Sequence, residues 1–131
     1  MDGPKASILL VDDEESVRTA VSRTLQAENY NCVLAASGKE ALKKASKQDF
    51  DVVLLDVKMP GLSGIEVLPR IIRKHPDTVV IMATAVVDLQ TAVEALNLGA
   101  CDYMTKPFDM NDLIIRVERA LEGKRLVRQN R

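Results

Sequence analysis

Short apolar runs alternate with amphipathic stretches along the chain, and the alternation is repeated five times. The apolar runs predict five β-strands, over Ser7 to Asp12, Asn31 to Ala35, Asp51 to Asp56, Thr78 to Ala83 and Cys101 to Thr105. Three of the runs are apolar at nearly every position, as in Val52-Val53-Leu54-Leu55. Because such strands are apolar on both faces, they are typical of a parallel sheet that is covered by helices on each side.

The stretches between and after these runs carry apolar residues at helical spacing. They predict five helices around Val17 to Leu25, Ala41 to Ala45, Ile65 to Ile72, Ala92 to Leu98 and Leu113 to Leu121. Pro69 falls near the first turn of the third helix, where proline is tolerated, and Gly99 is placed to end the fourth. Five βα units in a row predict an α/β fold with a doubly wound parallel sheet and right-handed crossovers.

Composition is that of one globular domain and excludes several functions. The chain has 131 residues, of which 47% are hydrophobic and 28% charged. Its formal net charge of -1 and its 3% aromatic content offer no basis for direct nucleic acid binding. The apolar runs are too short to span a membrane and the N-terminus lacks a signal-peptide pattern, so a cytoplasmic location is expected.

The histidine and the two cysteines show no catalytic or metal-binding pattern. His75 precedes Pro76 between a helix and a strand, where an exposed loop residue is expected. Cys32 and Cys101 lie far apart without metal-site spacing, so we expect reduced, partly buried thiols.

Polar side chains end four of the five predicted strands. Asp12-Asp13, Asp56, Thr84 and Lys106 stand at these ends, whereas the second strand ends in Ala35-Ala36. Ligands of open α/β sheets bind at the carboxyl ends of the strands. Any one acid alone would fit a solvated loop, but three converging carboxylates repel one another and call for a cation. Mg²⁺ fits, since it takes one or two carboxylates, keeps several waters and shares phosphate oxygens.

The other two strand ends suit a phosphoryl group. Lys106 can contact a phosphoryl oxygen or pair with Asp56, and the Lys106-Pro107 bond is open to a cis isomer that would aim the lysine inward. Thr84 offers a hydroxyl donor, and the main-chain amides near it can assist. An acid between Mg²⁺ and a lysine is placed for in-line attack on phosphorus, so Asp56 is the predicted phosphoacceptor.

Four motifs, in this order, resemble the receiver domain of two-component response regulators. They are Leu10-Val11-Asp12-Asp13-Glu14, Leu55-Asp56-Val57-Lys58-Met59-Pro60-Gly61 with Gly64, Thr84-Ala85 and Lys106-Pro107-Phe108. The resemblance covers residues 7–122 and implies a flavodoxin-like (βα)₅ fold with strand order 2-1-3-4-5. It leaves residues 1–6 as an N-terminal extension and 123–131 as a tail.

The resemblance implies that Asp56 accepts the phosphoryl group of a sensor histidine kinase. Asp13, Asp56 and the main-chain carbonyl of Lys58 would bind Mg²⁺, and Asp12 would act through metal-bound water. Such a domain catalyses only its own phosphorylation and dephosphorylation, and is not otherwise an enzyme.

The resemblance also implies a switch. Thr84 and Lys106 would contact the phosphoryl oxygens, and Tyr103 would turn inward as Thr84 moves; a half-buried strand residue is the alternative for Tyr103. Phosphorylation would then change the face formed by the fourth helix, fifth strand and fifth helix, which would control an output domain, a partner or dimerisation. The ranges of this face are Asp88 to Leu98, Cys101 to Thr105 and Asp109 to Glu122.

Two other functions and two forms of the tail stay open. An aspartyl-phosphate phosphatase usually has a second acid two residues after its nucleophile, where this chain has Lys58. An FMN module would need a Ser/Thr- and Gly-rich loop after the first strand, where Asp12 to Glu15 stand. In the tail, either Gly123 caps the fifth helix or the helix continues as a linker toward an output domain.

Overall fold

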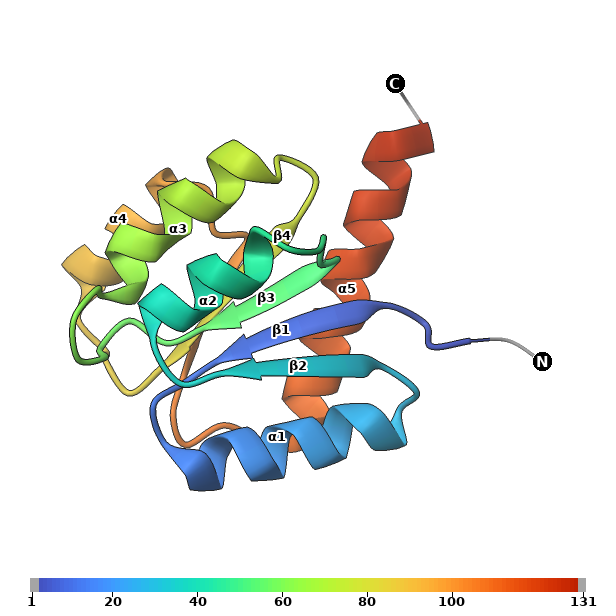
Figure 1. The fold of residues 1–131 in the computed structure, drawn as a ribbon, viewed down its shortest axis with the longest axis horizontal. Helices are drawn as coiled ribbons and strands as arrows, with labels where there is room; N and C mark the ends of the chain where they lie inside the picture. The colour runs from blue at the N-terminus through green and yellow to red at the C-terminus, as the bar shows by residue number, and fades with distance from the viewer. Residues whose placement is uncertain (1–2, 130–131) are drawn as a thin grey trace.

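The computed structural model describes residues 3–129 and has a five-stranded parallel sheet at its centre (Figure 1). Residues 1–2 of the expected N-terminal extension and 130–131 of the tail lie outside the described residues. The strands follow the order β2-β1-β3-β4-β5 and each neighbouring pair is parallel, which confirms the predicted fold class and order. Their bounds are β1 Ser7–Val11, β2 Asn31–Ala35, β3 Val52–Leu55, β4 Val79–Thr84 and β5 Asp102–Thr105.

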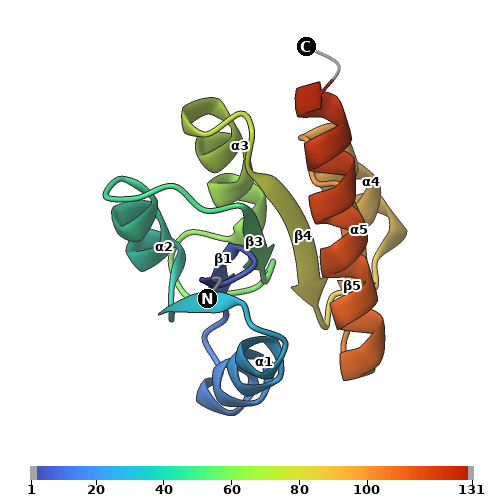
Figure 2. The ribbon, with the colours of Figure 1, turned by 90° about the vertical axis from the view of Figure 1, so that its right-hand side faces the viewer.

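Five helices cover the two faces of the sheet. Helices α1 and α5 lie on one face and α2, α3 and α4 on the other (Figures 1 and 2). Every predicted strand and helix is present, with bounds shifted by a few residues. The helix bounds are α1 Glu15–Ala27, α2 Gly38–Ala45, α3 Gly64–Lys74, α4 Leu89–Asn97 and α5 Met110–Gln129.

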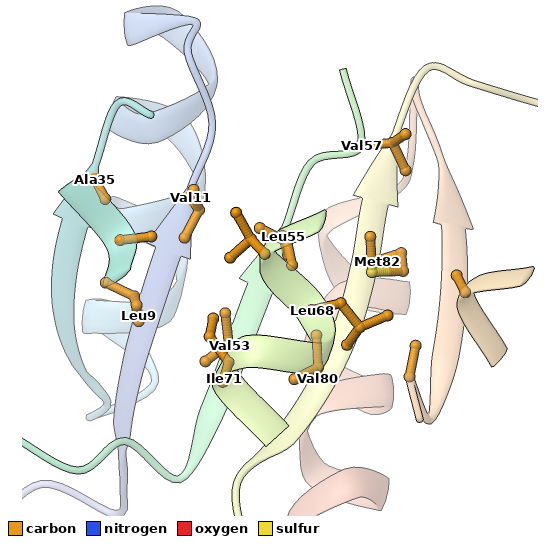
Figure 3. Close-up of a cluster of buried hydrophobic side chains, with 14 of the residues drawn as sticks. Leu9, Val11, Ala35, Val53, Leu55, Val57, Leu68, Ile71, Val80 and Met82 are labelled. Carbon is orange, nitrogen blue, oxygen red and sulfur yellow. The ribbon is translucent and has the colours of Figure 1, made fainter. Parts of the chain in front are cut away.

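The central strands are apolar throughout because successive side chains enter different helical layers. In β1, Leu9 and Val11 pack beneath α2 and α3 (Figure 3), whereas Ile8 and Leu10 pack against α1 and α5. All four side chains are almost completely buried. Burial of one such side chain contributes about 1.5–3 kcal/mol, so the two cores hold the strand ends rigidly in place.

Helix α3 begins earlier than its apolar pattern indicated. Ser63 and Glu66 form a reciprocal capping box, in which the Ser63 hydroxyl accepts from the Glu66 N–H and the Glu66 carboxylate accepts from the Ser63 N–H. Pro69 is consequently the sixth helical residue, so its placement near the first turn was wrong by one turn. The helix tolerates this proline in its second turn at the cost of one main-chain hydrogen bond.

The ends of α4 and α5 differ in the part that glycine plays. Gly99 follows the C-cap of α4 with φ +114, which confirms it as the stop of that helix. Gly123 instead lies inside α5, which continues to Gln129, so a cap at Gly123 was wrong. Lys124 ties this part of the helix to the sheet, since its Nζ lies 3.1 Å from Oδ1 of Asp51.

His75 is not the exposed loop residue that the sequence indicated. The side chain is half-buried at the end of α3, with Nε2 2.6 Å from the carbonyl oxygen of Ala45 and Nδ1 2.8 Å from Oδ1 of Asp49. It therefore joins the C-terminal ends of α2 and α3.

The two cysteines are free thiols, and one of them differs in exposure from the prediction. Cys32 is half-buried as expected, but Cys101 is exposed. Desolvation raises the pKa of the Cys32 thiol to about 11, and desolvation together with the charge of Asp102 does the same for Cys101. Between residues 3 and 129, no helix combines the length and apolar character that a membrane span requires.

Candidate functional site

Main-chain hydrogen bonds bring the polar strand ends together at one edge of the sheet. The Asp56 N–H donates to the Val11 carbonyl at 3.0 Å, one position beyond the paired strands β1 and β3. The Lys106 N–H donates to the Thr84 carbonyl at 2.8 Å in the same way. Asp56 and Lys106 thus continue the ladder of the sheet, which positions them more rigidly than a free loop would.

Three carboxylates converge at this edge. Asp12, Asp13 and Asp56 each offer an oxygen atom within 4.8 Å of the others, and Asp12 and Asp56 are buried while Asp13 is exposed. Oxygen donors at this spacing fit a hard divalent cation such as Mg²⁺. Lys58 lines the same open cleft, so the structure brings together all residues that the sequence proposed around the metal.

Lys106 is shared among the acids. Its Nζ lies 2.6 Å from Oδ2 of Asp12, 3.2 Å from Oδ2 of Asp56 and 3.5 Å from Oε1 of Glu14. The nearest partner is therefore Asp12, whereas the sequence named only Asp56. The Lys106-Pro107 peptide bond is cis.

The electrostatics show that one lysine does not neutralise the cluster. Desolvation raises the pKa of Asp12 above its ordinary value, although hydrogen bonds from Lys106 and the Glu14 N–H act in the opposite direction. Desolvation alone would lower the pKa of Lys106, but Asp12 and Asp56 outweigh it and the pKa lies above its usual range. Both partners of this ion pair are thus biased toward their protonated forms, as expected where buried carboxylates outnumber cations.

Thr84 and Tyr103 meet at Val86 in the loop after β4. The hydroxyl oxygen of the fully buried Thr84 accepts from the Val86 N–H at 3.2 Å. The hydroxyl of the half-buried Tyr103 donates to the Val86 carbonyl at 2.8 Å. Desolvation, with the charges of Asp88 and Asp56, raises the pKa of Tyr103. One loop residue therefore links the two side chains that the sequence named as a switch.

Gly64 sets the distance between α3 and the strand end that carries Asp56. Its N–H donates to the Val57 carbonyl at 2.7 Å, and a Cβ atom at this position would lie 2.1 Å from the main-chain oxygen of Asp56. Sequence reasoning included Gly64 in a motif but did not foresee this close approach, because spacing along the chain does not reveal it.

Arg18 is a contact that the sequence did not indicate. Its Nη1 donates to the main-chain oxygen of Asp12 at 2.7 Å. The signal available was its position in the first helical turn after the acidic loop.

Comparison with known families agrees with this geometry. Residues 8–118 match the response regulator receiver domain. The chain belongs to this family. As a receiver domain it is a signalling module of two-component systems.

Relatives of this receiver domain include longer regulators. It is 40% identical over 117 residues to the uncharacterized transcriptional regulatory protein YkoG of Bacillus subtilis (strain 168), covering 89% of this chain and 51% of that protein. It is 39% identical over 114 residues to the DNA-binding transcriptional regulator NtrC of Escherichia coli (strain K12), covering 87% of this chain and 24% of NtrC. The chain therefore spans about half of YkoG and about a quarter of NtrC.

A solved structure shows the same architecture at nearly full length. The CheY-like response regulator receiver domain protein from Methanospirillum hungatei JF-1 has a TM-score of 0.90 and 30% sequence identity. The match covers 95% of this chain and 98% of that chain, so the receiver fold accounts for almost the whole molecule.

Proposed function

We propose that this receiver accepts a phosphoryl group from a sensor histidine kinase onto Asp56, with Mg²⁺ as cofactor. The observation that supports it is the convergence of Asp12, Asp13 and Asp56 around a cleft that Lys106 also lines. Asp13, Asp56 and the main-chain carbonyl of Lys58 would hold the metal, and Asp12 would act through metal-bound water. Bound Mg²⁺ would supply positive charge to the carboxylates and to the phosphoryl oxygens.

The chemistry of the chain's own residues is a single displacement. A carboxylate oxygen of Asp56 forms a bond to phosphorus, and the bond between phosphorus and the donor breaks with the electron pair leaving on the donor. Lys106 already lies 3.2 Å from Asp56 and would contact the new phosphoryl oxygens. The Thr84 hydroxyl accepts one hydrogen bond and keeps its proton free to donate to the same group.

This chemistry is limited to the receiver's own phosphorylation and dephosphorylation. Lys58, where a phosphatase of this mechanism usually has its second acid, lies exposed at the cleft. The acidic loop after β1, with Asp12 bound to Lys106, disfavours the phosphate of FMN. A phosphoacceptor is therefore preferred to either alternative.

Removal of the metal tests this proposal directly. We expect radiolabelled acetyl phosphate to label the protein in Mg²⁺ and to leave it unlabelled in excess EDTA, because Asp56 would then face phosphate without sufficient positive charge. Hydroxylamine should release the label, as it does from acyl phosphates. Equal labelling in EDTA would contradict the role of Mg²⁺, and repeated turnover of a phosphate ester would favour the phosphatase.

We further propose that phosphorylation acts on α4, β5 and α5 through Val86. A phosphoryl group adds about two negative charges next to Thr84, and Thr84 and Tyr103 both bind Val86. The face beyond them carries apolar side chains in solvent, with Leu89 of α4 76% exposed and Val93 and Ile115 nearly half exposed. An exposed apolar surface of this kind suits an output domain, a partner protein or a second copy.

The longer regulators among the relatives support placing this receiver in a cytoplasmic transcription regulator with an output domain. The division of the chain at Glu122 stays a prediction. Residues 123–129 continue α5 as helix, which supports a linker that begins there.

Beryllofluoride with Mg²⁺, which imitates the phosphorylated aspartate, tests the switch. We expect the amide resonances of Val86, α4 and β5 to shift, and either the sedimentation coefficient or the affinity for the cognate output domain to change. The same addition to an Asp56→Asn variant is the control. Shifts confined to the cleft, with neither association nor affinity changed, would contradict the switch but leave the metal site intact.

A further inference from the structure

Asp13 is the one member of the carboxylate cluster without a side-chain partner. Asp12 and Asp56 are buried and both bind Lys106. The Asp13 side chain is exposed and makes no hydrogen bond or ion pair within residues 3–129. Its direction therefore depends entirely on the backbone that carries it.

That backbone is held on both sides of Asp12. The Asp12 N–H donates to the Ala35 carbonyl at 3.1 Å, and the Asp12 carbonyl accepts from the Arg18 guanidinium at 2.7 Å. The Asp12 carbonyl belongs to the planar peptide unit that ends at the Cα atom of Asp13. A hydrogen bond from a charged donor is roughly twice as strong as a neutral one, so Arg18 is well suited to orient this plane.

The start of α1 offers no alternative restraint from its N-cap side chain. Glu14 occupies the N-cap position and makes no side-chain capping hydrogen bond. Its N–H donates instead to Oδ1 of Asp12 at 2.9 Å, and its carbonyl accepts from the Arg18 N–H at 3.1 Å. Main chain and side chain of Arg18 thus bind the two ends of the short acidic loop.

We propose that Arg18 is a positioning residue for Mg²⁺ binding: its guanidinium orients the Asp12–Asp13 peptide so that the Asp13 carboxylate faces Asp56. This inference rests on the proposed function. Groups that orient metal ligands from outside the coordination sphere typically contribute 10- to 100-fold to metal affinity. Arg18 fits that description, since it contacts the ligand loop through a main-chain oxygen.

The charge of Arg18 predicts the opposite effect and makes the proposal testable. A guanidinium beside three carboxylates repels a divalent cation, so its removal would tighten Mg²⁺ binding if charge alone mattered. A purely structural role would lower stability and leave the affinity unchanged. Only the positioning role predicts weaker binding.

The experiment titrates Mg²⁺ alone into the wild type and four variants, following the amide resonances of the acidic loop. Arg18→Met keeps the aliphatic stem without a donor, Arg18→Gln keeps a shorter donor, and Arg18→Lys keeps both charge and a donor. Arg23→Met is the matched control, because Arg23 is an exposed arginine of α1 with no partner within residues 3–129.

We expect Arg18→Met to raise the Kd for Mg²⁺ about 10-fold, Arg18→Gln to fall between, and Arg18→Lys and Arg23→Met to stay near the wild type. An unchanged or lower Kd in Arg18→Met would overturn the proposal. Should that variant not fold, a Kd for Arg18→Gln no higher than for Arg18→Lys would do so. A wild type that fails to bind Mg²⁺ would instead overturn the metal in the proposed function.

Discussion

Replacing Asp56 with asparagine is expected to abolish labelling by acetyl phosphate at any Mg²⁺ concentration. The amide keeps the shape of the side chain but is a poor nucleophile and a weaker metal ligand. Asp12 stays paired with Lys106 at 2.6 Å and is too strongly engaged to substitute. Label incorporation, read by autoradiography after denaturing electrophoresis, is the measurement.

Asp13→Asn is the informative comparison for this result. Asp13 is a predicted metal ligand and not the acceptor, so labelling should become slower and recover partly at high Mg²⁺. The Asp56→Asn protein itself should remain folded, because losing one of two buried like charges relieves repulsion within the cluster. Undiminished labelling of a folded Asp56→Asn protein would assign the acceptor to another residue.

Gly64→Ala is expected to destabilise the fold by about 3 kcal/mol, the upper part of the usual cost of overpacking. The new Cβ would lie 2.1 Å from the main-chain oxygen of Asp56 and 2.9 Å from the Cα atom of Val57. Both are backbone atoms, so no side-chain rotation relieves the contact. The loop that carries Asp56 would have to move, and we expect slower labelling together with a lower urea midpoint.

Gly123→Ala is the matched control for that substitution, with the opposite expected sign. A Cβ at Gly123 would meet no atom within 4 Å, and the residue lies in the interior of α5. Alanine is favoured over glycine in a helix by about 0.5–1 kcal/mol, so this variant should unfold at higher urea. If both variants lost the same stability, the contact with Asp56 would not be the cause.

Local sequence was sufficient for the elements and for the residue types of the candidate site. The continuous apolar runs of β1, β3 and β4 follow from burial on both faces, and the parallel arrangement follows from the repeated βα order. The polar residues at the strand ends could be named as a group because the carboxyl ends of parallel strands share one edge. The strand order came from the resemblance, since nothing in a local pattern states which strands are neighbours.

Tertiary structure decided the contacts between residues that are distant in sequence or separated by a turn. Lys106 lies closest to Asp12, 94 residues away, and His75 reaches Ala45, because the packing of whole elements brings them together. Gly123 continues a helix where a cap was equally consistent with the sequence, since the pairing of Lys124 with Asp51 is not a local property. The sequence alone thus determined which chemistry gathers at the sheet edge, while the three-dimensional packing determined which atom holds which, because hydrogen bonds depend on distances that periodicity does not encode.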